Sequence, residues 1–421
     1  MEFRHTIRII MSHNRILTCR LSVVTVAATL FTATLILQPV IIIYNYSSIA
    51  KRVPKSIDIA YVNTIPGNIT LTRDWSFDPT FPKEQYNLST SNNIHRIFII
   101  PAFSSGSDDL EYPMVVDMPK LVGQVLSNLT VTSSPINDPK FPILMSEHQK
   151  CNNILLTTGE APELIILIKS APSNFLRRNA IRLTWGNDLC WGGRRVIHLF
   201  LLGNVPSNNE RLKYILKNES YVYHDIIQQD FLDHYYNSTY KIMFGINWAV
   251  KYCSNVPIIM FVDDDYFIYP KNVVAYIEGL STELRKLLIS GYVWYNAGPV
   301  RKNIGSHDKW LVDDKEYAPR YYPPYVAGGN FFLSMNLARQ LNIAMRYTKY
   351  LRFDDVYLGI ILKKLLHVPM HLKKVYTFHP VNLNSSEIYE MISSHGFGKS
   401  VSQFFLWDRL KCSTFCVHSI V

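Results

Sequence analysis

Hydrophobic residues in the second half of the chain come in short runs separated by amphipathic and polar stretches. Three runs have the length and apolar character of buried strands: ELIILIKS (163–170), RRVIHLFLLG (194–203) and PIIMFV (257–262). Before the third run, Tyr240, Phe244 and Trp248 recur at every fourth position, which predicts one buried face of a helix. This alternation of strands and helices predicts an α/β domain with a mostly parallel central sheet.

A different pattern begins the chain. Residues 21–43 carry no charged side chain and are long enough to cross a bilayer as a helix. The stretch is too long for the apolar region of a cleaved signal peptide, so it predicts an uncleaved transmembrane anchor. The short segment before it contains four arginines, which favours a cytoplasmic N-terminus. We therefore expect a single-pass type II membrane protein whose body lies in the lumen.

Composition divides the chain into five segments. We expect them to be a cytoplasmic tail (1–20), a transmembrane signal anchor (21–43), a luminal stem and pre-domain (44–160), an α/β domain (161–411) and a C-terminal tail (412–421). The stem and pre-domain are rich in Pro, Asn, Ser and Thr, whereas the alternating apolar runs begin only after them.

Sequons and cysteines agree with a luminal body. Asn-X-Ser/Thr sequons begin at Asn45, Asn68, Asn87, Asn128, Asn218, Asn237 and Asn384. Five cysteines follow the predicted anchor: Cys151, Cys190, Cys253, Cys412 and Cys416. In an oxidising lumen they could form two disulfides and leave one thiol, but the sequence leaves the pairing open.

The formal net charge is +10 at pH 7, with Lys and Arg spread along the chain. This spread indicates either a solvated basic surface or attraction for an anionic ligand or membrane surface. Because no Lys/Arg-rich run is present, we expect no nucleic acid partner.

Asp263, Asp264 and Asp265 directly follow the third apolar run. Ligands of open α/β sheets bind beyond the carboxyl ends of the strands, and three adjacent carboxylates there need a compensating cation. Oxygen ligands suit Mg²⁺, Mn²⁺ or Ca²⁺, and the stretch lacks the spacing of an EF-hand Ca²⁺ loop. Few protein carboxylates and open coordination positions suit a metal that also holds substrate phosphates. The alternative is an Asp-rich turn that caps a helix.

Three downstream stretches supply candidate partners for this acidic run. Gly328 and Gly329 precede an apolar strand and would let a ligand approach the backbone, unless they form an ordinary turn. Asp354 and Asp355 begin an apolar-periodic helix, where they could cap the helix or supply a general base. His379 follows another short apolar run and could complete an Asp-plus-His metal site.

An upstream stretch adds positive charge. Arg178 and Arg182 lie four residues apart, on one face of a predicted helix, where two guanidiniums could bind a diphosphate. Trp185 could pack against a base or a sugar. The alternative is an exposed basic helix.

Five stretches occur here in one order: RRNAIRLTWG, DIIQQDFLDHYYNSTYK, FVDDDYFI, YPPYVAGGNFFLS and FDDVYLGI. Together they resemble the β1,3-glycosyltransferase family of galactosyl- and N-acetylglucosaminyltransferases that includes Fringe. The resemblance covers roughly residues 160–400 and implies that the α/β domain (161–411) is a glycosyltransferase catalytic domain. Within the family, the stretches TFHP and EIYEMISSHGFG look like the Brainiac subgroup.

The resemblance implies a GT-A-like fold, a UDP-sugar donor, a divalent metal that is usually Mn²⁺, and residence in the Golgi membrane. By motif, Asp263, Asp265 and His379 would hold the metal. Asp355 matches the presumed catalytic base, and Asp354 stands where the family has glutamate. The expected donor-binding residues are Arg178, Arg182, Trp185, Asp263, Asp264, Gly328 and Gly329.

These features predict an inverting, metal-dependent β1,3-glycosyltransferase. It would move a hexose or N-acetylhexosamine, with GlcNAc favoured and galactose second, from UDP to a glycolipid or glycoprotein glycan. Asp355 would take the proton of the acceptor hydroxyl as that hydroxyl attacks the anomeric carbon. Two alternatives remain: a catalytically silent sugar-binding or scaffold member of the family, and a membrane-anchored hydrolase that uses carboxylate pairs.

Overall fold

The computed structural model describes residues 116–301 and 309–417, together with eight short strands earlier in the chain. The chain divides into two compact units, Met1–Leu110 and Glu111–Val421. The strands of the first unit are β1 (His5–Met11), β2 (Arg15–Leu21), β3 (Val40–Asn45), β4 (Ile57–Val62), β5 (Thr70–Arg73), β6 (Gln85–Thr90), β7 (Asn93–Phe98) and β8 (Pro101–Ala102). Most of the predicted anchor, residues 22–39, lies outside the described residues. Among the residues that the structure describes, no helix has the length and apolar character to cross a membrane.

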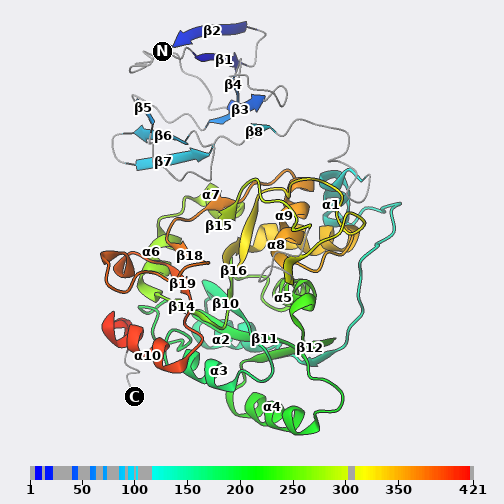
Figure 1. The fold of residues 1–421 in the computed structure, drawn as a ribbon, viewed down its shortest axis with the longest axis vertical. Helices are drawn as coiled ribbons and strands as arrows, with labels where there is room; N and C mark the ends of the chain where they lie inside the picture. The colour runs from blue at the N-terminus through cyan, green and yellow to red at the C-terminus, as the bar shows by residue number, and fades with distance from the viewer. Residues whose placement is uncertain are drawn as a thin grey trace. The chain divides into compact units, whose positions relative to one another are not determined.

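An eight-stranded sheet forms the centre of the second unit, in the order β17-β15-β16-β13-β10-β11-β12-β9 (Figure 1). Its strands are β9 (Ile143–Met145), β10 (Leu164–Lys169), β11 (Val196–Asn204), β12 (Ile226–Leu232), β13 (Ile258–Asp263), β15 (Ile289–Trp294), β16 (Tyr325–Ser334) and β17 (Met370–His371). The four strands β13, β10, β11 and β12 are parallel, whereas β16 and β9 join antiparallel to their neighbours. The predicted α/β class is confirmed, with a parallel centre and antiparallel strands beside it.

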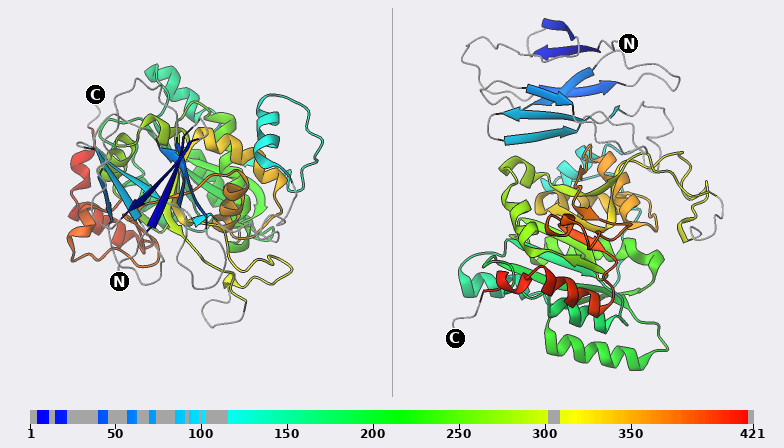
Figure 2. Two further views of the ribbon diagram at one scale, coloured as in Figure 1. Left: turned by 90° about the horizontal axis from the view of Figure 1, so that it is seen from above. Right: turned by 60° about the vertical axis from the view of Figure 1, so that its left-hand side comes forward.

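Helices cover both faces of this sheet (Figure 2). They are α1 (Met118–Leu126), α2 (Lys150–Thr158), α3 (Phe175–Arg182), α4 (Glu210–Tyr223), α5 (Ser238–Tyr252), α6 (Pro270–Glu278), α7 (Thr282–Lys286), α8 (Met335–Ala344), α9 (Asp354–Lys364) and α10 (Ser400–Arg409). Alternate residues of β10 enter the two cores, with Leu167 among α1, α5, α8 and α9 residues and Ile166 among α3 and α10 residues. Burial on both faces explains why this strand is apolar throughout rather than alternating.

A smaller sheet stands beside the end of β13. It consists of β14 (Tyr266–Ile268), β19 (Ser393–His395) and β18 (Val375–Tyr376), and β14 and β19 pair antiparallel with Tyr266 opposite His395. Four 3₁₀ turns complete the described elements: η2 (Tyr235–Asn237), η4 (Met345–Tyr347), η5 (Ser386–Tyr389) and η6 (Cys412–Phe415). The small sheet brings a C-terminal segment against the chain that leaves the acidic run.

The compact second unit extends beyond the predicted 161–411 domain at both ends. The compact unit begins at Glu111 rather than at residue 161, because α1 buries Met118 in the core and β9 adds an edge strand to the sheet. The C-terminal segment also belongs to the unit, since Cys416 is bonded to Cys190 and Cys412 is buried. An apolar helix face within a polar stretch gave too weak a sequence signal for the first boundary.

Two disulfides tie these added segments to the sheet unit. Cys151 of α2 is bonded to Cys253 at the end of α5, and Cys190 is bonded to Cys416. Cys412 keeps a free thiol. The prediction of two disulfides and one thiol is confirmed, and the structure supplies the pairing that the sequence left open.

Candidate active site

The predicted acidic stretches meet at the carboxyl end of the parallel strands. Lys169 and Asp263 are the last residues of β10 and β13 and lie opposite each other in the sheet. The Lys169 ammonium is 2.9 Å from a carboxylate oxygen of Asp263 and 2.9 Å from one of Asp354, the first residue of α9. One buried cation therefore joins the acidic run to the acidic helix start.

Lys169 stays charged in this position despite its burial. Burial alone would lower its pKa, but the charges and hydrogen bonds of Asp263 and Asp354 raise the pKa well above its ordinary value. The pKa of Asp263 is raised to about 6, chiefly by burial, with Lys169 opposing the shift and Asp265 adding to it. Sequence reasoning did not single out Lys169, although a lysine ending an otherwise apolar strand was a visible signal.

Asp264 has its oxygens filled by donors of this chain. It is 4% exposed and accepts hydrogen bonds from Ser170 Oγ at 2.6 Å, Asn174 Nδ2 at 2.8 Å and Arg177 Nη1 at 2.7 Å. These contacts fasten the end of β13 to the start of α3. We therefore assign Asp264 a structural role rather than the donor contact expected from the sequence.

Asp265 keeps one oxygen without a partner. Its Oδ2 lies 3.5 Å from His395 Nε2 and 3.6 Å from Arg177 Nη1, whereas its Oδ1 is buried without a hydrogen bond among the described residues. Burial would raise the pKa of Asp265, but the bond to His395 and the charge of Arg177 lower it. The bond to Asp265 in turn raises the pKa of His395. Asp265 is thus held as an anion with one free coordinating atom.

These residues fit a divalent cation that is shared with a phosphate ligand. The described residues contain no ready group of three or more His, Cys, Asp or Glu around one point. Asp263, Asp265 and His395 nevertheless offer oxygen and nitrogen donors, and the buried Oδ1 of Asp265 needs a partner. Mg²⁺-like ions are often bound by few protein ligands, and substrate phosphates then fill the open coordination positions.

The histidine expected at this site is a different one. His379, the predicted metal ligand, is an exposed residue after β18. His395 instead stands beside Asp265, because β19 pairs with β14 and Phe397 N donates to the Asp265 carbonyl at 2.8 Å. The stretch SSHGFG held the signal, but only the strand pairing distinguishes the two histidines.

Asp355 is the carboxylate best placed to act as a base. Asp354 is 8% exposed and paired with Lys169, whereas Asp355 is partly buried and accepts backbone hydrogen bonds from Val356, at 2.8 Å, and from Gly328. Burial and the neighbouring charge of Asp354 raise the pKa of Asp355 to about 7. A base whose pKa lies near the working pH is well matched to general base catalysis.

The double glycine lies inside β16 and gives room to protein side chains. A Cβ at Gly328 would lie 3.1 Å from Asp354 Oδ1, and a Cβ at Gly329 would lie 2.1 Å from Tyr266 Oη. The side chains that come close to these glycines in the structure are those of Asp354 and Tyr266. Both glycines support the site from within the sheet, and a direct donor contact stays a prediction.

The two arginines expected at the donor belong to a buried ion-pair network. Arg178 is fully buried and binds Glu219 through two hydrogen bonds of 2.7 and 2.8 Å. Arg182 pairs with Glu219 at 2.8 Å and with Asp225 at 2.7 Å. Arg178 reaches the acidic run only through Ser170, at 3.1 Å, so neither guanidinium is open to a diphosphate.

Trp185 also supports the site indirectly, through hydrogen bonds. Its side chain is fully buried beyond the end of α3, and its Nε1 donates to Gln403 at 3.1 Å, which in turn donates to the Tyr266 carbonyl at 2.8 Å. The predicted stacking on a base or sugar does not fit this burial. Arg177, which sequence reasoning passed over, is the partly exposed arginine that faces the acidic run.

Comparison with known proteins places these residues in context. The sequence model of the galactosyltransferase family matches residues 176–372. Human UDP-GalNAc:β-1,3-N-acetylgalactosaminyltransferase 1 is 31% identical over 287 residues, which cover 67% of this chain and 82% of that protein. Mouse β-1,3-galactosyltransferase 1 is 33% identical over 235 residues, covering 56% and 68%. The solved galactosyltransferase LgtC, in complex with donor and acceptor sugar analogs, aligns with a TM-score of 0.31 and 10% identity over 58% of this chain and 96% of that chain.

Proposed function

The chain belongs to the galactosyltransferase family of β1,3-glycosyltransferases, and on that premise we propose that it transfers a hexose or N-acetylhexosamine from a UDP-sugar to a glycan hydroxyl in a GT-A-like domain. One observation carries the proposal: two sets of acidic residues lie together at the carboxyl ends of the parallel strands. Asp263 and Asp265 lie on the side of the acidic run, Asp355 lies at the start of α9, and Lys169 bridges the two sides through Asp354.

On the donor side, we assign Asp263, Asp265 and His395 to a divalent cation, with Mn²⁺ expected from the family resemblance. When bound, such a cation would neutralise negative charge that develops on the leaving UDP. Arg177 would share this charge, because its partly exposed guanidinium already faces Asp264 and Asp265. Asp264 would keep this arginine and the chain turn in place.

On the acceptor side, Asp355 would accept the proton of the attacking hydroxyl. As the hydroxyl oxygen forms a bond to the anomeric carbon, its proton passes to Asp355 and the bond from that carbon to the UDP oxygen breaks. A single displacement turns an α-linked donor into a β-linked product. A positioned base of this kind contributes about 10²–10⁴-fold to the rate.

The donor sugar is the finer part of the proposal. The Brainiac resemblance predicts GlcNAc, whereas the relatives are named for transfer of GalNAc and of galactose. We place all three sugars within the proposed donor range. The acceptor would be a glycolipid or glycoprotein glycan.

The proposed setting is the Golgi lumen, with residues 21–43 as the membrane anchor. The disulfides Cys151–Cys253 and Cys190–Cys416 support an oxidising compartment, because such bonds are rare in reducing ones. Glycan removal from the full-length protein should increase its gel mobility if the sequons face the lumen.

The proposal is tested by incubating full-length protein in detergent with UDP-GlcNAc, UDP-GalNAc or UDP-Gal and methyl β-glycosides of galactose, mannose, GlcNAc and GalNAc. We expect one donor to yield a product whose new linkage is β1,3 by NMR. Chelation should abolish transfer and Mn²⁺ should restore it. UDP release without any glycan product, or transfer that resists the chelator, would contradict the assignment.

A further inference from the structure

Four aromatic side chains from distant segments contact one another in a row. We call them the aromatic row: Tyr235, Trp310, Phe378 and Trp294. Trp310 Nε1 donates to Tyr235 Oη at 2.8 Å, the rings of Trp310 and Phe378 are centred 6.3 Å apart, and those of Phe378 and Trp294 are 5.2 Å apart at 89°. The contacts are edge to face, an arrangement that aromatic pairs favour.

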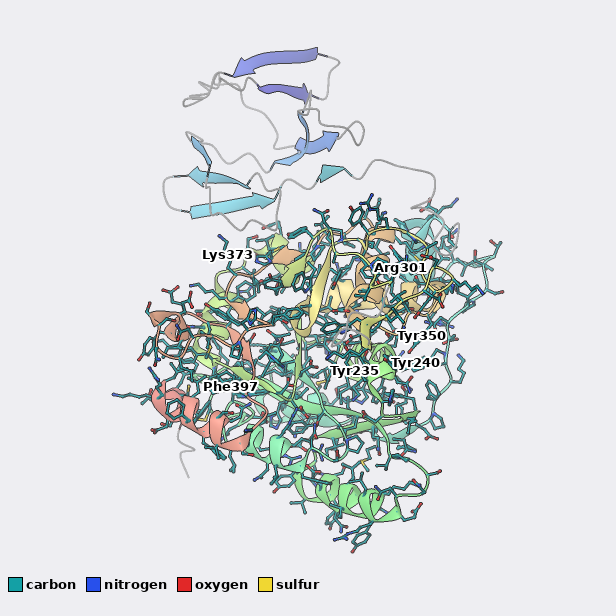
Figure 3. All side chains as sticks on the ribbon, in the orientation of Figure 1. Tyr235, Tyr240, Arg301, Tyr350, Lys373 and Phe397 are labelled. Atoms are coloured by element: carbon teal, nitrogen blue, oxygen red, sulfur yellow. A yellow bond between two sulfur atoms is a disulfide. The ribbon has the colours of Figure 1, made fainter. Side chains whose placement is uncertain are left out.

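One end of the row is fixed to the chain that leads into α9. Tyr350 donates to the carbonyl of Tyr236 at 2.8 Å, and Ser238 donates to the carbonyl of Arg352 at 3.3 Å. The rings of Tyr240 and Tyr350, labelled with Tyr235 in Figure 3, stack with centroids 4.6 Å apart. Because only Phe353 separates Arg352 from Asp354 and Asp355, this end of the row lies near the proposed base.

The other end is fixed to the acidic run. Thr377 Oγ1 is hydrogen-bonded to Tyr266 Oη at 2.9 Å, and Tyr266 directly follows Asp265. Phe378 is the next residue after Thr377. The aromatic row therefore extends from the start of α9 toward the segment that packs against the acidic turn. In agreement, burial and then the charges of Asp355, Asp354 and Asp263 raise the pKa of Tyr235.

The rings of the row are open to solvent to different degrees. Phe378 is 56% exposed and Tyr235 is 50% exposed. The Lys309 ammonium lies 4.6 Å from the Trp310 ring centre and 5.5 Å from that of Tyr235, so a cation already occupies the Trp310 face. We therefore take Phe378 to be the exposed ring that contacts a ligand.

We propose that the aromatic row is the acceptor subsite, in which the apolar face of an acceptor pyranose stacks on Phe378 and the Tyr235 hydroxyl donates to a hydroxyl of the same glycan. The inference rests on the proposed function and adds a ligand class, a pyranoside with an apolar face, and the residues that contact it. Ligand sites combine aromatic surface with a few polar groups that fix orientation, and this row supplies both. Trp310 and Trp294 are positioning residues that hold Tyr235 and Phe378.

Phe378→Ala tests the stacking contact in the full-length protein, with the methyl β-glycoside that the wild-type protein uses best as acceptor. We expect the acceptor KM to rise roughly three- to tenfold, the loss expected for one aromatic contact. The donor KM and kcat should stay near wild type, because Phe378 touches neither the donor nor the proposed base. Phe378→Trp should restore the acceptor KM, since it restores an aromatic face.

Phe405→Ala is the matched control, because Phe405 is 51% exposed and lies on α10. It should leave the acceptor KM unchanged. An unchanged acceptor KM in Phe378→Ala, or an equal change in Phe405→Ala, would overturn the subsite.

A binding measurement separates this inference from the proposed function. Saturation-transfer NMR with the same methyl β-glycosides should detect contact with wild-type protein and a weaker signal with Phe378→Ala, whether or not sugar is transferred. Absence of transfer from every donor would refute the proposed function alone. Equal NMR signals, or none, from the wild-type protein and Phe378→Ala would refute the aromatic row as a glycan site.

Discussion

Two charge networks draw their arginines from neighbouring positions of the chain, and they differ in the balance of positive and negative charge. In the first, the guanidiniums of Arg178 and Arg182 face the carboxylates of Glu219 and Asp225, so the charges match. In the second, Lys169, Arg177 and His395 face five carboxylates: Asp263, Asp264, Asp265, Asp354 and Asp355. A matched network needs nothing further, whereas a surplus of buried negative charge is stable only with a bound cation or proton.

The pKa shifts follow the same division. Burial alone would raise the pKa of Asp225, but the bonds from His198 and Arg182 lower it to about 2. For Asp355, burial and the charge of Asp354 outweigh the opposing contacts and raise the pKa to about 7. In the first network, side chains of the protein balance the charge. In the second network, a bound ligand and a proton are needed to balance the negative charge.

The largest expected effect comes from the surplus network. Asp355→Asn keeps the shape of the side chain but removes the proton acceptor, so kcat should fall by about 10²–10⁴-fold. UDP affinity, measured by calorimetry, should change little because the proposed base faces the acceptor. Near-normal turnover in Asp355→Asn would refute the base assignment.

The same variant should be more stable than wild type near pH 7. The raised pKa means that the folded protein binds the Asp355 proton more tightly than the unfolded chain does, so stability falls as pH rises from about 4 to about 7. An amide cannot ionise and removes that loss. A lower unfolding midpoint for Asp355→Asn at pH 7 would show that the carboxylate is instead satisfied by contacts within the protein.

Arg178→Met tests the matched network. It leaves Glu219 with one guanidinium in a buried setting, and breaking such a pair costs about 3–5 kcal/mol of unfolding free energy. Denaturant unfolding measures the loss, and the donor KM of the folded fraction should stay close to wild type. A donor KM that rises while stability is kept would return Arg178 to the donor site.

His395→Ala and His379→Ala sharpen the comparison at the metal side. Loss of His395 should raise the Mn²⁺ concentration for half-maximal activity by roughly 10–100-fold, the range seen when groups around a metal are removed. His379→Ala should leave this concentration unchanged, since His379 is exposed after β18. The reverse result would restore the histidine assignment made from the sequence.

The smallest expected effect is a pH profile. With a base of pKa about 7, turnover should rise as pH increases through 7 and level off above it, because only deprotonated Asp355 accepts the proton. Below that pKa, kcat should fall about tenfold for each pH unit. A profile that is flat between pH 5 and 8 would exclude a titrating base in that range.

The sequence predicted those parts of the molecule that local patterns control. Apolar runs and periodicity predicted the strands β10, β11 and β13 and the helices α5 and α9. The acidic run was singled out by its position directly after β13. The partners of charged residues could not be predicted in this way. Arg177 and Arg178 are adjacent, so they point about 100° apart on a helix, and the sequence does not say which of them faces the site.

Long-range pairing decided the remaining assignments. His395 rather than His379 stands at Asp265 because β19 pairs with β14, two short strands whose residues are far apart in the chain. Lys169 contacts Asp354 only because the start of α9 packs beside the ends of β10 and β13. The disulfide partners depend on tertiary contacts in the same way.

The close contact between Gly329 and Tyr266 constrains how the sequence can change over evolution. A Cβ at position 329 would lie 2.1 Å from Tyr266 Oη and 2.5 Å from Cζ, so deleting the hydroxyl alone would not make room for it. Substitution at either position is therefore conditional on the other, and a homologue with any side chain at position 329 should carry a much smaller residue at position 266. The two motifs, far apart in the chain, should covary as one inherited unit.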